Sequence, residues 1–150
     1  MFLMAEALKP LNTLVYGLCA GLWDLAGEGS KAIMRQIGRE LYERFIKENV
    51  DRSSLERALE STRKIMAEQF KVCEDISYTL KGDLVEIKVS GCILAEATKM
   101  LMEKNIPPIF CPYANVFVAM LEDVTGSSHD IKSIEKVSER ESLIILEKVA

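Results

Sequence analysis

The stretch VCEDISYTLKGDLVEIKVS, residues 72–90, sets the architecture that the sequence predicts. Before this stretch, apolar residues recur every three to four positions, as in helices, whereas within it they alternate with polar residues, as in strands. The two alternating runs flank residues 81–83 (KGD), a short loop suited to a β-hairpin. Val85, Ile87 and Val89 share one side of the second run, so the hairpin is expected to bury one face and wet the other.

Helices are predicted on both sides of this hairpin, and a second hairpin closes the chain. The expected fold is therefore α+β, with three N-terminal helices, a β-hairpin, two helices and a β-hairpin, and with one four-stranded antiparallel sheet packed on helices. The predicted elements outside the first hairpin are a helix over residues 3–25, a second carrying Ile33 to Ile46, a third from Ser53 to about Phe70, helices over 93–104 and from Pro112, and strands over 131–138 and 142–149.

The first helix contains an apolar run, LNTLVYGLCAGLWDLA, residues 11–26. A membrane span needs about 20 apolar residues, and this shorter run carries Asn12 and Asp24. A signal peptide begins with a basic segment, whereas the segment before this apolar run contains Glu6 and a single basic residue, Lys9. We therefore expect a cytoplasmic protein with no membrane span, and a first helix that is apolar nearly all round and central to the fold.

Length, charge and cysteine placement narrow the class of protein. The 150 residues match one domain, residues 1–150, and a net charge of −4 argues against nucleic acid as a partner. Cys19, Cys73, Cys92 and Cys111 lie in four different segments, unlike the disulfide framework of a small secreted domain. Reduced thiols are expected.

Two of the cysteines stand where helices are predicted to begin. Cys92 lies at a strand-to-helix junction and Cys111 at the N-cap of the next helix, where unpaired N–H groups lower a thiol pKa. Zinc is one candidate cofactor, with Cys92, Cys111 and His129 as ligands and Cys19 or Cys73 to complete the site if folding brings them together, although structural zinc prefers two close cysteine pairs. A thiol dyad with His129 and plain burial in the core remain alternatives.

Residues 91–121, which contain both of these cysteines, resemble the vinyl-4-reductase, or hydrocarbon-binding, family of small domains. Their sequence is GCILAEATKMLMEKNIPPIFCPYANVFVAML. The segment WDLAGEGSKAIMRQIGRELYERF, residues 23–45, resembles that family's glycine-bearing segment before a long helix. The resemblance implies a fold shared with transport protein particle subunits, a hydrophobic tunnel between helices and sheet, and frequent homodimers. One departure is that residues 131–149 hold no cysteine, where many members of that family have one.

The leading functional hypothesis is a non-catalytic module that encloses a small hydrophobic ligand, as a sensor or carrier. Helix-borne methionines and aromatic residues suit an adaptable apolar pocket, although an ordinary core uses the same residues. The alternatives are a protein-protein assembly subunit and a cysteine-ligated zinc protein. The residues expected to line the pocket are Leu18, Trp23, Met34, Ile37, Gly38, Leu41, Leu94, Phe117 and Met120.

Overall fold

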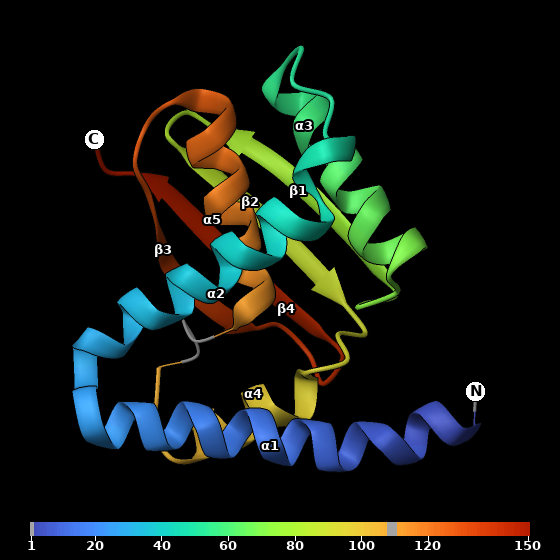
Figure 1. Ribbon diagram of the computed structural model, residues 1–150, viewed down its shortest axis with the longest axis vertical. Coiled ribbons are helices and arrows are strands. Elements are labelled where there is room, and N and C mark those ends of the chain that lie inside the picture. The colour runs from blue at the N-terminus through green and yellow to red at the C-terminus, as the bar shows by residue number, and fades with distance from the viewer. Residues whose placement is uncertain (1, 108–110) are drawn as a thin grey trace.

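A computed structural model describes residues 2–107 and 111–150, with side chains from residue 6 onward. It confirms the predicted α+β class and the order of its elements (Figure 1). The helices are α1 (Phe2–Ala26), α2 (Ser30–Phe45), α3 (Leu55–Lys64), α4 (Ala95–Glu103) and α5 (Pro112–Thr125). Short helical turns occupy Gly27–Gly29, Lys47–Asn49 and Ile65–Gln69, the last of them a π-helical turn that extends α3. The strands are β1 (Asp75–Lys81), β2 (Leu84–Ser90), β3 (His129–Lys136) and β4 (Glu141–Lys148).

The four strands form one antiparallel sheet in the order β1-β2-β4-β3. Both predicted hairpins are present, and β2 and β4 pair at the centre of the sheet. The predicted alternation is confirmed because Val85 and Ile87 of β2 are buried, as are Ile144 and Leu146 of β4. These side chains share the core with α5, which lies across the sheet beneath α2 (Figure 1).

The contact between α2 and α5 is unusually close. Gly38 is buried in the middle of α2, and a Cβ atom added there would lie 2.4 Å from the Cβ of Asn115 in α5. Two helices can approach so closely only where one of them carries no side chain. Gly38 is therefore a packing residue at the helix crossing.

The position of α1 differs from the prediction. It packs chiefly on α4 and lies along one side of the molecule, apart from the sheet (Figure 1). Cys19 is buried between these helices in a small second core, but Leu14 and Leu18 are each 60% exposed and Leu25 is 89% exposed. The expectation of a central first helix is wrong, because apolar content alone does not show which face has a neighbour. No helix among the described residues is long and apolar enough to cross a membrane.

Candidate functional site: a cluster of thiols

Three cysteines from three separate segments meet at one interior cavity. Cys73 precedes β1, Cys92 lies between β2 and α4, and Cys111 is the N-cap residue of α5. All three line a cavity of about 40 Å³, together with Phe117 and Tyr113 of α5 among others. A cavity of this size holds about one small molecule such as water. The thiols, although distant in sequence, are therefore neighbours in space.

Backbone hydrogen bonds hold the first two thiol-bearing loops side by side. The Ile93 N–H donates to the Val72 carbonyl at 2.9 Å, and the Glu74 N–H donates to the Ser90 carbonyl at 2.9 Å. Gly91 adopts φ +64°, and a Cβ atom there would lie 2.6 Å from the Glu74 side chain. The glycine thus permits the tight turn that brings Cys92 beside the segment of Cys73.

One of the two predicted helix-start cysteines accepts a backbone hydrogen bond, since the Leu94 N–H donates to the Cys92 Sγ at 3.4 Å. Cys111 is the N-cap residue of α5 without a side-chain capping bond, and the nearby N–H groups of Tyr113 and Ala114 favour its thiolate form electrostatically. The expected low pKa is nevertheless wrong. Burial raises the pKa of Cys92 to about 12, and burial likewise raises the pKa of Cys111, because loss of hydration outweighs the N–H bonds. Both groups are neutral thiols near pH 7.

The other two cysteines are also buried. Burial raises the pKa of Cys73 and of Cys19 to about 11. Cys73, Cys92 and Cys111 form the thiol group at the cavity, whereas Cys19 lies in the small core between α1 and α4, and no disulfide joins the four cysteines.

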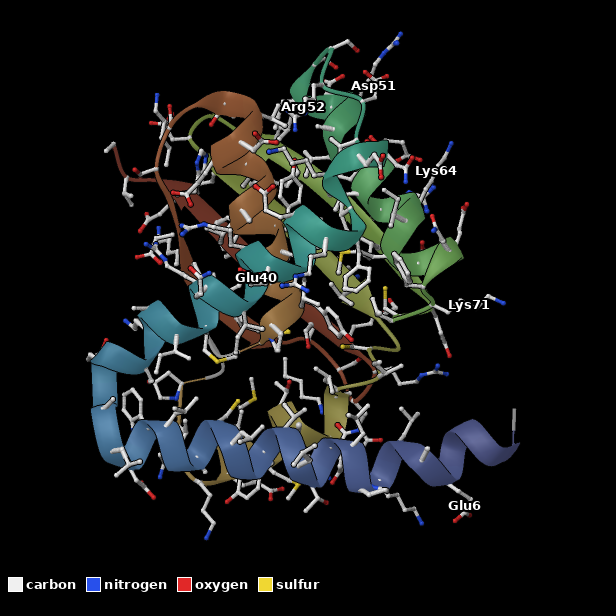
Figure 2. All side chains as sticks on the ribbon, in the orientation of Figure 1. Glu6, Glu40, Asp51, Arg52, Lys64 and Lys71 are labelled. Carbon is white, nitrogen blue, oxygen red and sulfur yellow. The ribbon has the colours of Figure 1, made fainter. Side chains whose placement is uncertain are left out.

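An open groove reaches this group from the surface. It has a volume of about 1030 Å³ and lies between α1 and the loops that carry Cys73 and Cys92, and these two residues line both the groove and the interior cavity. The groove's charged lining residues include Lys9, Lys71 and Glu96. Lys71 extends outward at the end of the π-helical turn (Figure 2). Small reagents can therefore approach two of the thiols without unfolding of the core.

The raised thiol pKa values give a testable prediction. At pH 8, Cys92 should react with iodoacetamide about 1,000-fold more slowly than an unhindered cysteine, because only the thiolate reacts and a pKa of about 12 makes it scarce. The rate should rise about tenfold per pH unit. Peptide mass spectrometry of timed samples measures it, and rapid labelling at pH 8 would contradict the burial of this thiol.

The same shift predicts how stability depends on pH. A pKa raised on folding means that the native state holds its proton more tightly, so its stabilising contribution is complete below the unfolded pKa, about 8.5. Above pH 8.5, each such thiol should lower the free energy of unfolding by about 1.4 kcal/mol per pH unit, until the pH reaches the pKa of the thiol in the folded state. Urea denaturation between pH 7.5 and 10 should show this loss, and Cys92→Ala should reduce its slope.

A tetrahedral iron or zinc site needs four converging ligands, or three and an open position. Across residues 2–107 and 111–150, no group of three or more His, Cys, Asp or Glu side chains is arranged to hold a metal ion. Cys73, Cys92 and Cys111 share a cavity, yet they do not form such a site. The donor set of the described chain therefore does not fit a four-thiolate centre.

His129, the third candidate metal ligand, does not line the thiol cavity. It is buried at the start of β3, and its Nδ1 lies 2.8 Å from the Ser127 carbonyl. Its own carbonyl accepts a hydrogen bond from Arg35, at 2.8 Å. These contacts join β3 to the end of α5 and to α2, so the observed partners of His129 are structural.

The residues predicted to line a ligand pocket are dispersed. The side chains of Leu18 and Ile37 are exposed, whereas Gly38 packs directly against Asn115 and leaves no space for a ligand there. Leu41 lines a separate apolar groove of about 460 Å³ beside Phe45 and Phe70. Trp23 and Met34 belong to the small core beneath α1, Met120 and Phe117 to the main core, and Leu94 is buried at the start of α4.

Sequence reasoning missed one residue that positions the site. Asn12 of α1 is 4% exposed, and its amide donates to the carbonyls of Leu8 and Ile93, each at 2.8 Å. Its Oδ1 accepts from the Ala97 N–H at 2.9 Å. Asn12 thus ties α1 to the loop after Cys92. The available signal was a single amide inside an apolar helical run, which is typical of a buried polar contact.

Comparisons with known proteins show a family and a relative to which the chain is similar. Residues 11–150 match the family described as "Putative rubredoxin C-terminal domain". The chain is also 24% identical over 127 residues, 81% of its length and 73% of the relative's, to an uncharacterized protein of Methanocaldococcus jannaschii.

These matches correct two predictions. The proposed resemblance to the vinyl-4-reductase family is wrong, because the family match is a different one. The hydrophobic-ligand function that followed from that resemblance loses its support with it. By a match that extends over nearly its whole length, the chain belongs to the family described as "Putative rubredoxin C-terminal domain".

Proposed function

We propose that this chain is a thiol redox domain that works beside a rubredoxin-type metal centre. The observation that carries the proposal is the shared cavity, which Cys73, Cys92 and Cys111 all line although at least 18 residues lie between any two of them in sequence. The family description supports a redox setting by naming a rubredoxin, a protein whose iron is held by cysteine thiolates. The described residues do not fit such a centre, so the iron is assigned to a separate domain or partner.

Cys92 and Cys111 are the proposed reactive pair. Both thiols line the shared cavity, and a negative charge on Cys111 would raise the pKa of Cys92 more than one on Cys73. The Cys92 Sγ accepts the Leu94 N–H, and the N–H groups of Tyr113 and Ala114 favour negative charge on Cys111 as it develops during reaction. Burial keeps both thiols protonated at rest, which protects them from unselective modification.

The proposed reaction is the oxidation of two thiols to one disulfide. Two S–H bonds break, one S–S bond forms, and two protons and two electrons leave. One hydrogen peroxide takes both electrons with the two protons and becomes two waters, and two one-electron acceptors of the rubredoxin type would supply the same oxidising capacity. The disulfide is uncharged, so it suits an apolar cavity better than a thiolate does.

Oxidation of the reduced chain with hydrogen peroxide tests the proposal. The expected product is a monomer lighter by about 2 Da whose tryptic peptides are linked between Cys92 and Cys111. Under anaerobic conditions, oxidised rubredoxin should lose its visible absorbance when the reduced chain is added. Cys92→Ser and Cys111→Ser should each abolish both results, whereas Cys19→Ser should retain them. Four titratable thiols after oxidation and unfolding, or linkage only between molecules, would refute the pair.

A further inference from the structure

The outer face of α1 carries an apolar seam with a heptad spacing. Its members follow one another at intervals of four, three, four, three and four, as the core positions of a coiled coil do. All of them are exposed: Ala7, Leu11, Leu14, Leu18, Gly21 and Leu25. None is charged, and α1 meets the rest of the chain mainly through α4, on another side. Glu6 extends away from the sheet near the start of this helix (Figure 2).

We infer that this seam pairs with the same seam of a second copy, antiparallel and about a two-fold axis near residue 16. This interface goes beyond the proposed redox function and does not depend on it. A two-fold contact brings the same surface of both copies together, so the seam must be complementary to itself. The order of large and small residues along α1 meets that condition in one direction only.

In the antiparallel pairing, each large residue faces a small one except at the centre. Leu11 lies opposite the partner's Gly21, Leu25 opposite the partner's Ala7, and Leu14 opposite the partner's Leu18. Space is open over Gly21, since a Cβ atom added there would contact nothing within 4 Å. A parallel pairing would instead set Gly21 against Gly21 and Leu11 against Leu11, leaving a void in one layer and crowding in another.

Helix polarity favours the antiparallel arrangement, and the small interface area limits the affinity of the dimer. Antiparallel helices bring the positive N-terminal end of one α1 near the negative C-terminal end of the other. The seam from Ala7 to Leu25 covers about 28 Å of a helix about 10 Å wide, which allows about 300 Å² of contact per copy. Stable interfaces bury about 800 Å² per partner, so this dimer should be weak and should depend on protein concentration.

Analytical ultracentrifugation of the full chain over a range of concentrations tests the dimer. Leu18→Glu places two carboxylates in the central layers and should raise the dissociation constant at least about 100-fold. The matched control is Val137→Glu, which adds the same charge at a 55% exposed position of the loop between β3 and β4 and should leave the dissociation constant unchanged. Circular dichroism should show both variants folded. A monomer at all concentrations, or equal effects of the two variants, would overturn the proposal.

Cysteine cross-linking tests the direction of the pair. A mixture of the Leu11→Cys and Gly21→Cys chains should form mixed disulfide dimers at least tenfold faster than either chain alone forms dimers. Faster cross-linking of Leu11→Cys with itself would show a parallel pair and overturn the assigned arrangement. This result is independent of the Cys92 and Cys111 chemistry, which Leu18→Glu should leave intact.

Discussion

Gly38→Ala should be the most destabilising single methyl addition in this chain, lowering the free energy of unfolding by about 3 kcal/mol or more. The new Cβ would lie 2.4, 2.5 and 2.6 Å from the Cβ, carbonyl carbon and carbonyl oxygen of Asn115. Two of these atoms are backbone, so no rotamer change can relieve the clash. The helices α2 and α5 would have to separate, which would loosen the core on which the sheet packs.

Urea denaturation followed by circular dichroism measures this loss. Gly17→Ala is the matched control, because Gly17 is also helical but a Cβ atom there meets nothing within 4 Å. That change should be neutral or stabilise by up to about 1 kcal/mol, from helix propensity alone. Because Asn115 lies one turn after Cys111, Gly38→Ala should also speed thiol labelling at the cavity. Equal stability of the two variants would contradict the close α2–α5 crossing.

Asn12→Ala should lower the free energy of unfolding by about 2–4 kcal/mol, the second largest expected effect, because it leaves a buried backbone N–H and a partly buried carbonyl without their partners. The Ile93 carbonyl and the Ala97 N–H both bond the Asn12 amide, and alanine can bond neither. These bonds join α1 to the loop and helix that follow Cys92. Their loss should therefore free α1 locally before the sheet unfolds.

Hydrogen exchange and thiol labelling measure this change together. In Asn12→Ala, the Ala97 amide should exchange at least tenfold faster, and the Cys92 thiol should react at least tenfold faster with iodoacetamide. Thr13→Ala is the control, since Thr13 is the exposed neighbour whose hydroxyl bonds only within α1, to the Lys9 carbonyl. That variant should stay within about 0.5 kcal/mol of the natural chain. Unchanged exchange at Ala97 would show that Asn12 does not anchor the helix.

The predictable part of the site was its position along the chain. Cys92 at a strand-to-helix junction and Cys111 as a helix N-cap followed from local signals, namely the end of the alternating run and the proline after Cys111. That Cys73 joins them did not follow, because it depends on hydrogen bonds between residues 72–74 and 90–93. The direction of the thiol pKa shifts could not be predicted from the sequence either, since the burial of a thiol depends on all the segments that surround it.

The sequence by itself determined the order of helices and strands, because periodicity, caps and turn residues act between neighbours in the chain. The hairpin at residues 72–90 is the clearest case, although its register pairs Lys81 with Leu84, so the turn holds only residues 82–83 and not the predicted 81–83. Tertiary structure alone decided that β2 lies beside β4, that α1 packs on α4 apart from the sheet, and that three scattered thiols line one cavity. Each of these depends on contacts between distant segments, whose energies become definite only when the whole chain packs.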